Sequence, residues 1–110
     1  MKELEISVQT VVQKLNKGED MLLLDIRPLE QRKVSSIPGS IHREVYTQLV
    51  EGDDTIFDEE VWDKKIPIIT FCGGGKTSLL AAALLQKKGY LAWSLQGGLQ
   101  AWNQVQSQSK

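Results

Sequence analysis

The chain has a single cysteine, Cys72, and a single histidine, His42, among its 110 residues. One thiol cannot form an internal disulfide, which excludes a disulfide framework and fits a reducing compartment. The residues around His42 have no metal-ligand spacing, so we interpret it as an ordinary strand-end or surface residue and expect no metal site. At this length, one domain can bury about two thirds of its unfolded surface without disulfides or structural metals.

The sequence also lacks an excess of either charge and any long apolar run. Its formal net charge is −1, from 13 basic and 14 acidic residues, so bulk electrostatics gives no reason to expect nucleic-acid or membrane binding. The first five residues, MKELE, have none of the apolar core of a signal peptide, and no segment is long enough to span a bilayer. A soluble, cytoplasmic protein is therefore expected.

What the sequence does have is one informative stretch, IPIITFCGGGKTSLLAAALLQKK, over residues 66–88. Its first six residues are mostly β-branched or aromatic, which predicts a buried strand over 66–71. Three glycines follow Cys72, and the apolar run after them, closed by lysines and Gly89, predicts a helix. The stretch therefore predicts a strand, a tight loop and a helix, with the only thiol at the turn.

The position of Cys72 predicts a reactive thiol. A cysteine attacks as the thiolate, and three features would favour that anion: glycine amides turned inward as a nest, the positive end of the helix dipole and the charge of Lys76. An inert buried cysteine is the alternative, but ligands of open α/β sheets bind at the carboxyl ends of strands, where this one lies. The predicted site is Cys72 with an anion-binding loop of Gly73, Gly74, Gly75, Lys76, Thr77 and Ser78.

A second interpretation of the same loop is a phosphate-binding P-loop, because Gly75-Lys76-Thr77 matches the end of that motif. The motif requires a glycine five residues before Gly75, where this chain has Thr70. A downstream strand ending in a magnesium-binding aspartate is also missing, since the run that resembles it, LLLD at 22–25, lies upstream. Nucleotide binding therefore stays as an alternative without the full motif.

The remaining sequence predicts helices and strands in alternation, so we expect a three-layer α/β/α fold around a mostly parallel sheet of four or five strands. The expected strands are 21–26, 40–42, 66–71 and 91–95, and the expected helices are 8–17, 30–34, 58–64, 76–88 and 99–105. The helix at 58–64 would turn Val61 and Trp62 inward, and 44–54 is interpreted as irregular or partly helical. Residues 1–110 are expected to form one domain with a frayed polar tail at 106–110.

Four short motifs give the sequence a family resemblance. They are LLDIR at 23–27, which looks like the family's LLDVR strand; IPGSI at 37–41, which looks like HIPGAI; CGGGKTS at 72–78, similar to the CxxGxRS loop; and GGLQAW at 97–102, similar to a closing GG…AW motif. All four occur in order, and the similarity covers nearly the whole chain. On these residues the sequence resembles a single-domain rhodanese.

The resemblance implies a sulfurtransferase with ping-pong kinetics. Cys72 would take sulfane sulfur from a donor such as thiosulfate or a persulfide, become a persulfide itself, and pass the sulfur to cyanide, a thiol or a protein acceptor. The loop amides would stabilise the anionic states, and no metal or organic cofactor would be needed. Asp25 is expected to form a structural ion pair. Arg27 either joins that pair or draws anions to the site, in which case Arg27→Ala should raise the KM for thiosulfate.

The chain departs from the family pattern at what we expect to be the rim of the site. Thr77 stands where many members carry arginine, which predicts weaker binding of anionic donors, while Arg32 replaces an aromatic residue and Ser35-Ser36 replaces a Gly-His pair. Ser78 occupies the position where a cysteine phosphatase of this fold needs its arginine, so phosphatase or arsenate reductase activity is not expected. A non-catalytic rhodanese-like binding module is the second functional class, although such a module need not keep the cysteine and the glycine loop.

Overall fold

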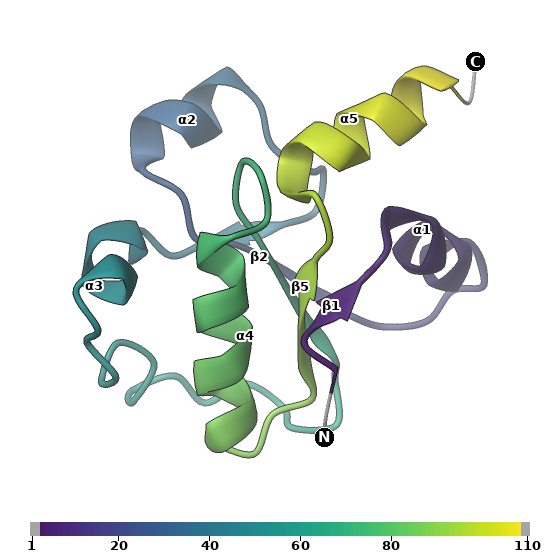
Figure 1. Ribbon diagram of the computed structural model, residues 1–110. Helices are drawn as coiled ribbons and strands as arrows, with labels where there is room; N and C mark the ends of the chain where they lie inside the picture. Colours follow the sequence, from purple (N-terminus) through teal and green to yellow (C-terminus); the bar gives the residue numbers. More distant parts are fainter. Residues whose placement is uncertain (1–2, 109–110) are drawn as a thin grey trace.

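The computed structural model describes residues 3–108, in which a parallel sheet has helices on both faces (Figure 1). The strands are β1 Glu5–Ile6, β2 Leu22–Asp25, β3 Ile41–His42, β4 Ile68–Phe71 and β5 Ala92–Leu95. The helices are α1 Val8–Asn16, α2 Leu29–Val34, α3 Tyr46–Val50, α4 Thr77–Lys87 and α5 Gly98–Gln108. The strand order is β1-β5-β4-β2-β3, and every pair is parallel. The predicted three-layer α/β/α fold is confirmed.

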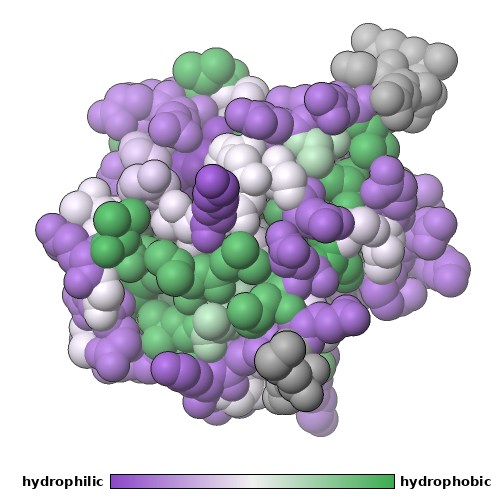
Figure 2. All heavy atoms as spheres, in the orientation of Figure 1, coloured by the Kyte–Doolittle hydropathy of each residue, from purple (hydrophilic) through white to green (hydrophobic). Residues whose placement is uncertain are grey.

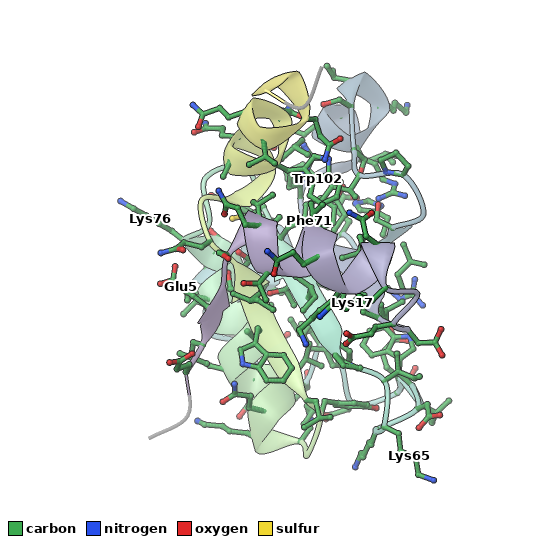
Figure 3. The ribbon with its side chains drawn as sticks, turned by 90° about the vertical axis from the view of Figure 1, so that its right-hand side faces the viewer. Glu5, Lys17, Lys65, Phe71, Lys76 and Trp102 are labelled. Atoms are coloured by element: carbon green, nitrogen blue, oxygen red, sulfur yellow. The ribbon has the colours of Figure 1, made fainter. Side chains whose placement is uncertain are left out.

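The sheet has an apolar core on each face, because side chains alternate along strands that are covered on both sides. In β2, Leu23 belongs to one core and Leu24 to the other. The core of Leu24 includes residues of α3 and α4, and the core of Leu23 includes residues of α1 and α5. Figure 3 shows the face with α1 and α5, where Phe71 of β4 and Trp102 of α5 belong to the same core.

The surface over α3 and α4 is partly apolar. Figure 2 shows this face, on which hydrophobic side chains gather over the two helices. Val50 at the end of α3 is 61% exposed, and Leu80 in the first half of α4 is 50% exposed. Leu80 comes one turn after Thr77, so this apolar surface begins next to the start of α4.

The two central strands end side by side, which brings predicted site residues together. β2 pairs with β4 in a register that places Asp25 opposite Phe71. Cys72 follows Phe71 directly, so the segments after both strands emerge at the same edge of the sheet. Ligands of open α/β sheets bind at this carboxyl edge.

The predicted helix at 58–64 is wrong. This segment runs through turns and irregular backbone, and Val61, expected to point inward, is 92% exposed. Trp62 does pack against the core, through two neighbouring aromatic rings. The Asp63 carboxylate accepts a hydrogen bond from the Lys65 amide over 2.9 Å, and such local bonds compete with those of a helix.

The other differences are one missed strand and several element ends. The prediction omits β1, because two residues at the edge of a sheet carry no readable strand period. β4 begins at Ile68 rather than at 66, since Pro67 has no N–H for the strand ladder. α5 extends to Gln108, beyond the predicted end at 105, and 44–54 is partly helical as expected, through α3. The end of the predicted tail, 109–110, lies outside the described residues.

Candidate functional site

Cys72 lies at the carboxyl edge of the sheet, directly after β4. A tight loop of residues 73–76 connects it to α4, which begins at Thr77. Cys72 borders a cavity of about 280 Å³ formed by the end of β2, by α2 and α3, and by this loop. The lining residues are Arg27, Gln31, Tyr46, Cys72, Gly73, Gly74, Lys76 and Thr77. Most of the predicted loop therefore faces one cavity, whereas Gly75 and Ser78 are buried.

The Cys72 sulfur forms hydrogen bonds with the loop and with α4. The Gly75 amide donates to Sγ over 3.1 Å, and Ser78 Oγ lies 3.4 Å from Sγ. Burial raises the pKa of the Cys72 thiol, whereas hydrogen bonds from the Ser78 hydroxyl and from backbone amides lower it. These amides belong to Ser78, Gly75 and Thr77. The lowering prevails, so the pKa of Cys72 lies below its ordinary value and a larger share of the thiol is ionised than in an isolated cysteine.

Lys76 places a positive charge beside the cavity, immediately before α4. Its side chain is exposed and extends away from the body of the molecule in Figure 3. Within residues 3–108, the structure shows no ion pair or hydrogen bond of its ammonium group, so the charge is available to an anion. The lowered pKa of Cys72 agrees with the sequence-based prediction, but hydrogen bonds rather than the Lys76 charge are its main cause.

The first turn of α5 holds the loop from behind. The Leu99 amide donates to the Cys72 carbonyl over 2.8 Å. The Gln100 amide donates to the Gly73 carbonyl over 3.1 Å. Amides in the first turn of a helix have no partner within the helix, so these are free to bind the loop. Gly98 has a φ of +60°, and a Cβ there would lie 2.4 Å from the Cys72 carbonyl oxygen, so only glycine permits this close approach.

Asp25, at the end of β2, is buried and holds Arg27 beside the cavity. Its carboxylate accepts hydrogen bonds from Arg27 Nε over 2.9 Å and from Arg27 Nη2 over 2.8 Å, a bidentate arrangement. Burial raises the pKa of Asp25, but hydrogen bonds from Arg27 and Ser36 and the Arg27 charge bring it below its ordinary value. The Arg27 guanidinium also donates to the Ser35 carbonyl over 2.7 Å. The expected ion pair is present, and a role of Arg27 in binding anions stays a prediction.

Comparison with known proteins identifies the family. The model of the rhodanese-like domain family matches residues 7–105. The chain belongs to the rhodanese-like domain family. The match includes the loop that could also be interpreted as a P-loop, and it favours the interpretation as a rhodanese loop. The resemblance predicted from the four sequence motifs is confirmed.

Some relatives of this rhodanese-like domain have names that refer to sulfur transfer. A tRNA sulfurtransferase of Desulfurococcus amylolyticus is 35% identical over 80 residues, which are 73% of this chain but only 14% of that protein. The putative sulfurtransferase YtwF of Bacillus subtilis is 26% identical over 98 residues, with 89% of this chain and 88% of that one covered. A rhodanese-like domain protein of Staphylococcus aureus shares the fold, with a TM-score of 0.74, 24% identity and 90% of each chain covered. The two relatives named as sulfurtransferases support a general role in sulfur transfer, and the solved structure supports the fold.

Two residues of this rhodanese-like domain lie elsewhere than expected. Arg32 and Ser36 do not line the cavity rim but contact the Asp25 carboxylate. Arg32 Nη1 lies 3.2 Å from Asp25 Oδ2, and the Ser36 hydroxyl donates to the same oxygen over 3.0 Å. Sequence reasoning also missed Gln31 and Tyr46, which line the cavity. They have no local signal, because only tertiary packing brings α2 and α3 to the loop.

Three further observations concern helix length, metal-ligand clusters and His42. Across residues 3–108, none of the helices combines the length and the apolar character needed to cross a membrane. In the same part of the chain, no three histidine, cysteine, aspartate or glutamate residues gather in a way that could hold a metal ion. His42 ends β3 as expected, and its Nε2 lies 2.7 Å from the Arg27 carbonyl oxygen.

Proposed function

We propose that this rhodanese-like domain is a sulfurtransferase that carries sulfane sulfur as a persulfide on Cys72. The observation that carries this proposal is the environment of the sulfur: a thiol with a lowered pKa accepts a hydrogen bond from a loop amide and borders a cavity next to Lys76. A thiolate so placed can act both as a nucleophile and as a leaving group. The sulfurtransferase names of two relatives support the same chemistry.

The reaction would proceed by two displacements. In the first, the Cys72 thiolate attacks the outer sulfur of thiosulfate, the S–S bond of thiosulfate breaks, and sulfite leaves with the bonding electrons. Cys72 is then a persulfide with a negatively charged terminal sulfur. In the second, cyanide or another nucleophile attacks that terminal sulfur, the S–S bond of the persulfide breaks, and the Cys72 thiolate is restored. Neither step with these reactants transfers a proton, so the site has only to stabilise negative sulfur.

The chain's own residues suggest how this charge would be stabilised. The amides from Gly73 to Ser78 would donate hydrogen bonds to the anionic sulfur, as the Gly75 amide donates to the Cys72 sulfur. Lys76 would attract the donor, and the pair of Asp25 and Arg27 would support the wall of the cavity. No metal or organic cofactor takes part in these steps.

The cavity indicates what kind of donor and acceptor would fit. At about 280 Å³, it is slightly smaller than most sites for drug-sized molecules, which suits thiosulfate or a small persulfide as donor. The acceptor would be cyanide, a small thiol, or a protein that presents a thiol at the cavity mouth. A protein acceptor would meet the exposed apolar surface of α3 and α4 nearby. We place this chemistry in the cytoplasm, because the only thiol suits a reducing compartment.

The intact mass of the reduced protein tests the proposal. After incubation with thiosulfate and removal of the excess, we expect a gain of one sulfur atom, which cyanide should then remove. Protein whose only thiol has been blocked with iodoacetamide should gain none. If neither thiosulfate nor glutathione persulfide, tested separately, gave an adduct, the result would contradict the proposal and favour a non-catalytic binding module.

Lys76→Gln should weaken the use of an anionic donor. The ammonium group lies beside the cavity without a counter-ion, so its loss should raise the KM for thiosulfate by about three- to tenfold, with little change in kcat. High salt should reduce the difference, because exposed charges are screened. Lys65→Gln is the matched control, since Figure 3 shows Lys65 at the opposite end of the molecule from Lys76. Equal KM values for the two variants would mean that Lys76 does not attract the donor.

A further inference from the structure

Behind the Cys72 sulfur lies a pair of buried serine hydroxyl groups. Ser78 Oγ is 3.4 Å from Cys72 Sγ, and Ser94 Oγ is 2.7 Å from Ser78 Oγ. Ser78 is in the first turn of α4, Ser94 is in β5, and both are 0% exposed. Neither serine lines the cavity, so Ser94 could affect a substrate there only indirectly, through Ser78 and Cys72.

The protonation state of Cys72 sets which atom donates in its hydrogen bond with Ser78. Each hydroxyl has one proton to donate and lone pairs to accept others, and among the described residues the Ser94 hydroxyl has Ser78 Oγ as its one partner. A Cys72 thiolate has no proton, so in its hydrogen bond with Ser78 the hydroxyl is the donor, and the Ser78 oxygen is then free to accept the proton of Ser94. With a neutral thiol, Sγ–H can donate to Ser78, and Ser78 can then donate to Ser94.

We propose that Ser94 is a positioning residue, whose hydroxyl donates to Ser78 and thereby keeps the Ser78 proton directed at the Cys72 sulfur. A helical serine can otherwise donate to a backbone carbonyl one turn earlier. Accepting a hydrogen bond from Ser94 strengthens the bond that Ser78 donates, because linked hydrogen bonds polarise one another. The inference rests on the proposed function, in which the Cys72 thiolate is the attacking and leaving group. What it predicts directly is the ionisation of Cys72, which can be measured without the reaction.

The charged groups near Cys72 lie on the cavity side. The charged and titratable ones that line the cavity are Arg27 after β2, Tyr46 from α3 and Lys76 from the loop, while α2 contributes the uncharged Gln31. α5 contributes backbone amides, which bind the carbonyls of Cys72 and Gly73. On the buried side, the Ser78 hydroxyl reaches the sulfur, and the Ser94 hydroxyl reaches Ser78.

Titration of the thiolate absorbance tests the proposal, because this chain has one cysteine. The variants are Ser94→Ala, Ser78→Ala and the double variant, each compared with wild type. Below the titration midpoint, we expect the thiolate fraction to fall by about threefold in Ser94→Ala and by about tenfold in Ser78→Ala, as the loss of an indirect and of a direct hydrogen bond would give. The double variant should match Ser78→Ala, because Ser94 acts only through Ser78.

Thr70→Val is the matched control. Thr70 is also buried, and its hydroxyl donates to the Ser78 carbonyl over 2.8 Å, but it does not bind either serine hydroxyl or the sulfur. This variant should lower Tm and leave the thiolate titration unchanged. A wild-type titration curve for Ser94→Ala, or equal and additive effects of the two serine variants, would overturn the proposal. The titration uses no sulfur donor, so its outcome tests the role of Ser94 alone. The persulfide experiment tests the proposed function, and either one can fail without the other.

Discussion

Cys72→Ser should abolish sulfur transfer and leave the fold intact. A serine hydroxyl stays protonated at neutral pH, so it supplies neither the attacking anion nor a persulfide. We expect the rate of thiocyanate formation from thiosulfate and cyanide to fall by at least about 10³-fold, as when other enzymes lose their nucleophile. The rate is measured as thiocyanate released, and the mass gain with thiosulfate should disappear as well.

The stability of this variant serves as the control. Ser78 and the Gly75 amide can bind a serine oxygen at position 72 as they bind the sulfur, so Tm should stay close to that of wild type. The chain has no second cysteine to take over the reaction. A folded variant that retained a substantial share of the activity would therefore show that the reaction does not pass through a cysteine persulfide. A wild type as inactive as the variant would favour a binding module.

The loop around Cys72 could be predicted because its parts are adjacent in the sequence. The strand, the three glycines and the helix over 66–88 carry period, turn and capping signals that need no tertiary information. The direction of the pKa change follows from the same neighbours, because amides of Gly75 and Thr77 reach the sulfur from within the loop and the helix start. Local sequence therefore gives the position of the thiol and its immediate environment.

The supports of this loop could not be predicted, because they come from distant segments. Tyr46 reaches the cavity on α3, whose position depends on packing against α4. The glycine motif that contains Gly98 predicts a turn, but nothing in it indicates that α5 binds the carbonyl of Cys72. The wrong helix at 58–64 has the same origin, since Trp62 points inward through contacts with other rings rather than through helical periodicity.

Gly98→Ala should displace the loop and lower both activity and stability. A Cβ at this position would lie 2.4 Å from the Cys72 carbonyl oxygen and 2.7 Å from the Gly73 carbonyl oxygen. Both are backbone atoms, so either the loop or the start of α5 must move. Because a displacement of about 1 Å can cost about 100-fold in rate, we expect kcat/KM for thiosulfate to fall by about that factor. Steady-state kinetics and thermal unfolding of the variant measure the two effects.

Gly39→Ala separates the backbone cost of alanine from the displacement of the loop. Gly39 also has a positive φ, +82°, but nothing lies within 4 Å of a Cβ built there. Its replacement should cost about 1–2 kcal/mol of stability and leave kcat/KM near the wild-type value. Equal losses of activity in both variants would assign the effect to backbone strain. Wild-type activity in Gly98→Ala would show that the close approach of α5 to the Cys72 carbonyl is not what positions Cys72.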